Sequence, residues 1–170
     1  IHGNNIGPIG GWNGLWLIGS FDVDAQNNTI SDIAREPVIA GDYWAGDNPD
    51  VRRLYFANNQ VSTPGTGSCQ SNTHWGGEFT CPVVMVHRAG ATLVDNVFTA
   101  GGTADGIRAT GALLNVQRNT WNLNAAGAVI QNFDTGAAGA QQYGSLAFFT
   151  DNQWNGVTST YDVTKSSVTV

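Results

Sequence analysis

The stretch ALLNVQRNTW, residues 112–121, contains the pattern that decides the fold of this chain. Its asparagine, Asn119, is followed two positions later by Trp121 and preceded, three and five positions earlier, by Val116 and Leu114. Where the chain extends far enough, apolar residues stand at the same positions around five other asparagines, namely Asn4, Asn28, Asn59, Asn96 and Asn152. Apolar residues at alternate positions are typical of a strand with one buried face. The repeated phrase therefore predicts a set of equivalent strands.

The repeats follow one another at intervals of 24, 31, 37, 23 and 33 residues. A minimal unit of 23 or 24 residues with insertions of variable length is typical of a solenoid. A second short apolar run follows most of the asparagines, for example at Val129 and Ile130, so that each coil has at least two strands separated by glycine-containing corners. We expect residues 1–170 to form a single all-β domain of about six to seven stacked coils with parallel sheets.

Three phrases, LYFANNQV (54–61), ALLNVQRNTW (112–121) and LAFFTDNQW (146–154), resemble the right-handed parallel β-helix of the pectin-lyase-like superfamily, and the resemblance covers essentially the whole chain. It implies that the six asparagines point inward and stack as a ladder of hydrogen-bonded amides, since a buried amide without a partner costs roughly 1 to 3 kcal/mol. That superfamily includes lyases, hydrolases, epimerases, phage fibres and adhesins. The resemblance thus implies a fold and leaves the activity open.

Charge and composition narrow the classes of partner. The chain has a net charge of −6 and a pI near 4.6, whereas nucleic-acid binding calls for a basic face. Its apolar runs are all far shorter than a membrane span. We therefore expect neither nucleic acid nor a membrane span, and the sequence offers no pattern that calls for a cofactor or a resident metal.

Cys69 and Cys81 are the only cysteines, and both lie in the longest insertion, residues 62–82. A disulfide that closes this loop would contribute roughly 3 kcal/mol of stability in the chain-entropy model. The alternatives are two separate buried thiols, or metal binding together with His74. A disulfide favours an extracellular or cell-surface location. Asn27 begins an Asn-Asn-Thr sequon and is a candidate for glycosylation.

His87 and Arg108 are weak catalytic candidates, expected on neighbouring coils and on the outward face of one sheet. A base and a cation near each other could abstract a proton beside a uronate carboxylate, which is the chemistry of polysaccharide lyases. The favoured interpretation is instead a pair of solvated side chains. The acidic residues give no catalytic pair either, because Asp22 is expected to form an ion pair with Arg53. A column of outward residues before the asparagines predicts a second pairing of charges, Asp95, Arg118 and Asp151.

Several aromatic residues fall in corners and insertions rather than at inward positions. Exposed rings stack on sugars and anchor interfaces, so carbohydrate binding is expected to involve Trp12, Tyr43, Trp44 and Trp75. The alternative is that the insertions fold over the sheets and bury these rings in small satellite cores.

Both ends of the sequence have the pattern of strands, at Ile1 and at residues 161–170. Open sheet edges recruit further strands, so the partners expected here are identical subunits or flanking coils of the same protein. The favoured function is an extracellular structural or adhesive β-helix that assembles end to end. The alternatives are a carbohydrate-binding spike module and, less favoured, a polysaccharide lyase or hydrolase.

Overall fold

The computed structural model describes residues 1–17, 22–41, 53–69, 79–131, 144–164 and 167–170. Within these ranges the chain forms strands and no helix. Eighteen strands build three six-stranded sheets in which all neighbours are parallel. Two further strands, β8 (Ser68–Cys69) and β9 (Phe79–Thr80), form an antiparallel pair.

The three parallel sheets are named here by the order of their strands. Sheet I contains β3 (Asp22–Gln26), β6 (Arg53–Ala57), β11 (Gly90–Val94), β14 (Leu113–Gln117), β17 (Leu146–Thr150) and β20 (Ser167–Thr169). Sheet II contains β1 (Asn5–Ile6), β4 (Thr29–Ile30), β7 (Gln60–Thr63), β12 (Val97–Ala100), β15 (Thr120–Asn122) and β18 (Gln153–Asn155). Sheet III contains β2 (Leu15–Leu17), β5 (Val38–Gly41), β10 (Val84–His87), β13 (Ile107–Thr110), β16 (Ala126–Gln131) and β19 (Ser159–Thr164).

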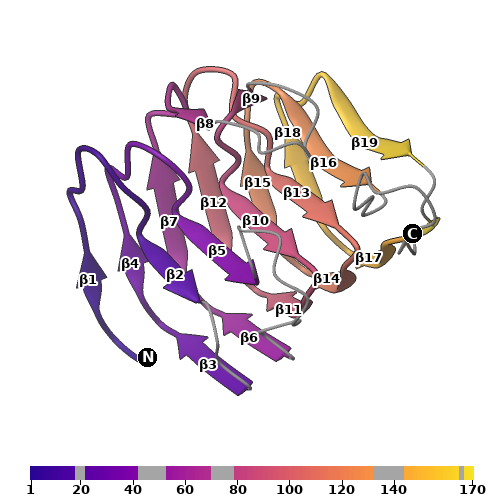
Figure 1. Ribbon diagram of the computed structural model, residues 1–170, viewed down its shortest axis with the longest axis horizontal. Coiled ribbons are helices and arrows are strands. Elements are labelled where there is room, and N and C mark those ends of the chain that lie inside the picture. Colours follow the sequence, from indigo (N-terminus) through magenta and orange to yellow (C-terminus); the bar gives the residue numbers. More distant parts are fainter. Residues whose placement is uncertain (18–21, 42–52, 70–78, 132–143, 165–166) are drawn as a thin grey trace, which may run out of the picture.

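The chain visits sheets II, III and I in turn, so each strand pairs with the strand of the preceding circuit. Figure 1 shows this as a colour gradient that runs along the stack from the N-terminus to the C-terminus. The register aligns equivalent positions of the repeat, for example Ala91 with Leu114 and Leu114 with Ala147. The expected all-β, parallel, solenoid-like architecture is confirmed in the described residues.

The corner between sheet I and sheet II is built by a residue in the left-handed region. The φ angles at these corners lie between 52° and 56°, at Asn27, Asn58, Asp95, Arg118 and Asp151. Each of them immediately precedes one of the repeated asparagines. A residue other than glycine pays roughly 1 to 2 kcal/mol for this conformation, so the interactions around it must hold the corner in place.

A stack of aromatic rings fills the interior next to sheet II. The register places Phe98, Trp121 and Trp154 on consecutive strands. Their ring centroids are 4.0 Å apart between Phe98 and Trp121, and 5.2 Å apart between Trp121 and Trp154. Two glycines make room for the large rings: a Cβ on Gly106 would lie 3.0 Å from the Trp121 ring, and one on Gly127 would lie 2.7 Å from the Trp154 ring.

Candidate functional site

The side chains of the six asparagines lie in a hydrogen-bonded series along the stack. Asn59 Nδ2 donates to Asn96 Oδ1 at 3.0 Å, and the backbone N–H of Asn59 donates to the same oxygen at 2.9 Å. The same pair of bonds joins Asn4 to Asn28, Asn28 to Asn59, Asn96 to Asn119 and Asn119 to Asn152. Each bonded side-chain oxygen thus accepts twice from the asparagine of the preceding circuit.

The series has a direction, and its middle members are the most buried. Asn28, Asn59, Asn96 and Asn119 are at most 1% exposed, whereas Asn4 is exposed and Asn152 is half-buried. Each amide donates toward the C-terminal end of the stack and accepts from the N-terminal end. Asn4 therefore offers an acceptor oxygen at one end, and Asn152 offers a backbone donor at the other.

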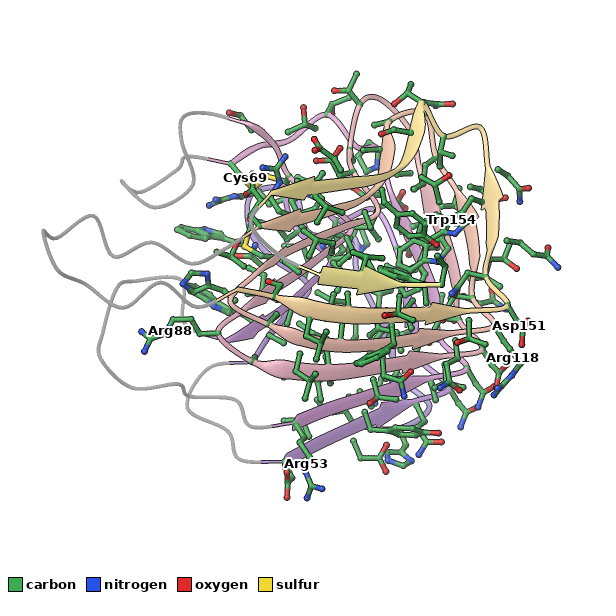
Figure 2. The ribbon with its side chains drawn as sticks, turned by 90° about the vertical axis from the view of Figure 1, so that its right-hand side faces the viewer. Arg53, Cys69, Arg88, Arg118, Asp151 and Trp154 are labelled. Atoms are coloured by element: carbon green, nitrogen blue, oxygen red, sulfur yellow. A yellow bond between two sulfur atoms is a disulfide. The ribbon has the colours of Figure 1, made fainter. Side chains whose placement is uncertain are left out.

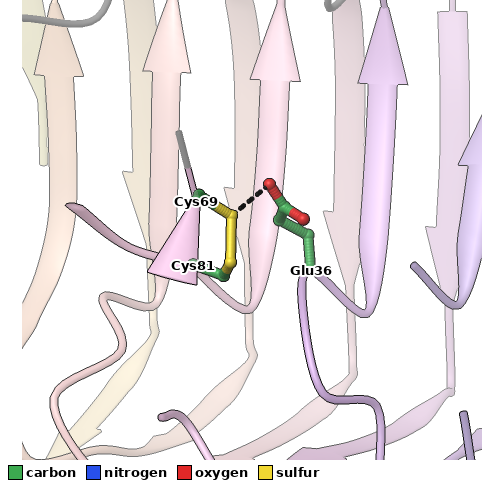
Figure 3. A group of neighbouring side chains, drawn as sticks. All are labelled: Glu36, Cys69 and Cys81. Carbon is green, nitrogen blue, oxygen red and sulfur yellow. Dashed lines mark hydrogen bonds between the residues drawn. A yellow bond between two sulfur atoms is a disulfide. The ribbon is translucent and has the colours of Figure 1, made fainter. Parts of the chain in front are cut away.

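The Cys69–Cys81 disulfide is confirmed, with an S–S distance of 2.05 Å. It lies against the buried carboxyl of Glu36, whose Oε1 is 2.6 Å from Cys69 Sγ (Figure 3). A disulfide sulfur has no proton to give, so a hydrogen bond at this contact requires Glu36 to be protonated and to donate. Asn13 Nδ2 donates to the other carboxyl oxygen, Oε2.

Burial raises the pKa of Glu36 above its ordinary value. The hydrogen bond from its own backbone N–H, the nearby Arg35 guanidinium and the Asn13 amide act in the opposite direction but are outweighed. Arg35 Nε lies 3.7 Å from Oε2, which is within ion-pair distance but too far for a hydrogen bond. The environment of Glu36 therefore favours its neutral form more than water does.

Glu36 makes stability depend on pH. Its folded pKa is raised, so its contribution is fully present below pH 4.5, the ordinary glutamate value, and is lost as pH rises through the folded pKa. Each unit of difference between folded and unfolded pKa corresponds to about 1.4 kcal/mol. Glu36→Gln imitates the neutral acid and still accepts from Asn13. We expect the melting temperature of this variant, relative to the parent, to rise from pH 4 to pH 8. An unchanged difference over that range would contradict a raised pKa of Glu36.

Among the described residues, Glu36, Cys69 and Cys81 form the one group of potential metal-ligating side chains whose atoms lie within 4.8 Å of one another. The two sulfurs are joined to each other, so neither is the thiolate that a metal would need. In its oxidised form this cluster is a covalent link with a buried acid beside it.

His87 and Arg108 do not form the solvated pair expected from the sequence. They lie on the same face of sheet III, but the register pairs Arg108 with Met85 and His87 with Thr110. His87 is only 1% exposed, and Arg108 donates to Asp105 at 2.7 Å. The outward face of sheet III is buried here, because Met85, Thr110 and Val129 lie on it with exposures of 0 to 5%. A polymer in solvent does not reach the His87 imidazole in this structure.

Both predicted surface ion pairs are confirmed. Arg53 binds Asp22 with two hydrogen bonds of 2.9 and 3.0 Å. Arg118 binds Asp95 with bonds of 2.8 and 2.7 Å, which lower the pKa of that carboxyl. Asp151 lies close to Arg118 at the same corner (Figure 2) and raises the pKa of its guanidinium further.

The aromatic candidates are only partly placed. Trp12 is 64% exposed, with the Arg35 guanidinium 5.8 Å from its ring centroid. Tyr43, Trp44 and Trp75 lie outside the described residues. Asn27, the glycosylation candidate, is exposed at its corner, and its modification stays a prediction.

A groove of about 510 Å³ lies on the outward face of sheet I, which the sequence did not single out. Its lining on this face includes Arg53, Gly90, Thr92, Leu113, Asn115, Gln117, Phe148 and Thr150. Leu113 and Phe148 are 57% and 40% exposed. The register places these side chains on β6, β11, β14 and β17, four consecutive strands of the sheet.

Comparison of the chain with models of protein families, with curated proteins and with solved structures found no match. In the part of the chain that the structure describes, no helix is long and apolar enough to cross a membrane.

Proposed function

We propose that this chain is a right-handed parallel β-helix of the pectin-lyase-like kind, with about six to seven coils and an interior asparagine ladder. It serves as an extracellular structural or adhesive protein. Its coils are continued end to end by identical subunits or by flanking coils of the same protein. The observation that carries this proposal is the polar hydrogen-bonded asparagine series within three parallel sheets.

The two ends of the stack are complementary. At one end the outermost strands of the three sheets are β1, β2 and β3, and at the other they are β18, β19 and β20. Each end therefore exposes one edge strand of every sheet. The strands of an added coil could pair with these edge strands in the parallel arrangement of the rest of the stack. At the first end Asn4 supplies a side-chain acceptor, and at the second Asn152 supplies a donor. A coil added at either end would continue both the sheets and the asparagine series.

A head-to-tail contact of this kind does not close on itself, and repeated contacts of this kind produce filaments. The disulfide supports an oxidising environment. The disulfide between Cys69 and Cys81 and the buried asparagine ladder both favour a stable fold, as a protein outside the cell requires.

The proposal is tested by placing a charge on the open end. Val163 occupies the inward register position of β19, next to Ile130, and is 41% exposed there. Val163→Lys would bury an unpaired ammonium under any added coil, which costs several kcal/mol. We expect the parent chain to associate end to end in sedimentation velocity and electron microscopy, and Val163→Lys to weaken that association at least about tenfold.

The matched control is Asp162→Lys, one residue earlier on β19 and on the outward side of the strand. This variant should associate as the parent does. A parent chain that remains monomeric at all concentrations, or a Val163→Lys variant that assembles normally, would overturn the proposal.

A further inference from the structure

The groove on sheet I exists because of one missing side chain. The outward row that contains Leu113 and Leu146 has Gly90 opposite Leu113 on β11. On the next strand, β6, Leu54 pairs with Ala91, so the preceding residue, Arg53, is aligned with Gly90. Gly90 therefore lies between Arg53 on β6 and Leu113 on β14. The hollow between Arg53 and Leu113 is therefore part of the folded sheet itself and not of an insertion.

The next outward row has two polar residues between two aromatic ones. Tyr55, Thr92, Asn115 and Phe148 are aligned on four consecutive strands. Neighbouring strands are about 4.8 Å apart, so the two aromatic positions lie roughly 14 Å apart with a hydroxyl and a carboxamide between them. The rings of Tyr55 and Phe148 are 41% and 40% exposed. Gln117 Nε2 donates to Asn115 Oδ1 at 2.8 Å and so orients that amide.

The charges at the groove are already compensated. Among the described residues that line it, Arg53 is the one with a charge, and Asp22 holds its guanidinium through two hydrogen bonds. A neutral ligand with many hydroxyls and with apolar C–H faces suits this surface, because rings stack on such faces and the amide and hydroxyl fix their orientation. An acidic or basic ligand would have to compete with an existing ion pair.

We propose that the groove on sheet I binds an uncharged oligosaccharide that lies across the strands, with Phe148 as its main stacking platform and Asn115 as its main polar contact. The size of the groove favours this occupant over a protein. A volume of about 510 Å³ is within the range of small-ligand sites, and the groove is lined by 11 described residues, whereas a stable protein interface involves roughly 20 to 30 residues on each side. The site is independent of the end-to-end contacts, which involve the edges of the sheets.

Titration calorimetry of the full chain with a panel of hexasaccharides tests this assignment. The panel contains the neutral β-1,4-glucan, β-1,4-xylan and α-1,4-glucan hexamers and the acidic α-1,4-galacturonan hexamer. We expect at least one neutral hexamer to bind more tightly than the uronate. Phe148→Ala and Asn115→Ala should each weaken that binding at least about tenfold, as expected for groups at the centre of an interface.

Val97→Ala is the matched control, since Val97 is 42% exposed on sheet II, away from the groove. It should bind as the parent does, and so should Val163→Lys, which separates this proposal from end-to-end assembly. Thermal melts confirm that each variant is folded. The proposal is overturned if no neutral hexamer binds, if Phe148→Ala binds like the parent, or if Phe148→Ala only abolishes a dimer in sedimentation velocity, because the groove would then hold a second copy.

Discussion

Asn96→Leu is expected to lower the free energy of unfolding by about 3 to 5 kcal/mol. The Asn96 side chain takes part in four hydrogen bonds: two that Oδ1 accepts from Asn59, and two that Nδ2 donates to Asn119 Oδ1 and Phe56 O. Each such bond contributes roughly 1 kcal/mol, and an abandoned buried donor costs more. The variant leaves the backbone N–H of Asn59 without its acceptor in a site that is 1% exposed, whereas Asn59 Nδ2 keeps the carbonyl oxygens of Ala25 and Ala57 as acceptors. Urea unfolding followed by circular dichroism measures the change.

Asn4→Leu is the matched control for this substitution. Asn4 is exposed, and its Oδ1 stands at the end of the series, so water can replace its lost bonds. We expect this variant to cost less than about 1 kcal/mol. Equal effects at Asn4 and Asn96 would show that burial of the series does not determine its contribution to stability.

The sequence predicted the parallel sheets because the repeated phrase combines two separate signals. Alternation around Asn119 marks the inward face of a strand, and the interval to the next asparagine marks one circuit. Neither signal depends on the length of the insertions. The left-handed corner was missed because Asp95 and Arg118 in that position read as surface charges. Asparagine and aspartate favour such corners, but arginine has no special preference, and only the backbone shows that it adopts one.

Burial on the outward side of a strand could not be predicted in the same way. The alternation of apolar and polar residues tells which side of a strand faces the interior, but it does not tell what lies over the opposite side. His87 therefore read as solvated, although it is 1% exposed. Met85, which lies on the same outward face of β10, was the better indicator. A methionine between two inward valines, Val84 and Val86, indicates a strand that is buried on both faces.

The Glu36 cluster was invisible for another reason. Glu36 lies 33 residues from Cys69 and 23 residues from Asn13, so no local pattern joins them. The second interval equals the minimal repeat, which places Asn13 and Glu36 on adjacent circuits. Residues at equivalent positions of the repeat can thus be identified as neighbours on adjacent coils once the coils are aligned. The disulfide cannot be placed by that logic, because Cys69 and Cys81 belong to an insertion.

The position of the groove also follows from the alignment of equivalent residues on adjacent coils. Its row has a glycine at Gly90 where other circuits have Leu113 and Leu146. A single glycine in a strand pattern indicates a bulge or a close approach, and here it produces a hollow on the outward face instead. Recognition of that hollow needed the register, since a shift of one residue would have placed Gly90 in the core.

Trp121→Ala is expected to lower the free energy of unfolding by about 3 to 5 kcal/mol, the usual cost of deleting a large buried ring. Trp121 is fully buried, and its ring lies between those of Phe98 and Trp154. Gly106, which makes room for the ring, has no side chain that could fill the space left behind. The cavity would therefore persist, and the stacks on both sides would lose a partner. Calorimetric unfolding of the variant measures the loss.

Trp121→Phe separates the ring stack from the indole N–H. Trp121 Nε1 is buried and has no hydrogen-bond partner among the described residues, so its removal relieves a desolvation cost of about 1 to 3 kcal/mol. Phenylalanine keeps a ring between Phe98 and Trp154 but leaves a smaller void. These two effects oppose each other, and we expect Trp121→Phe to unfold within about 1.5 kcal/mol of the parent. A Trp121→Phe variant as unstable as Trp121→Ala would show that the indole shape, and not aromatic stacking, holds the interior of these coils together.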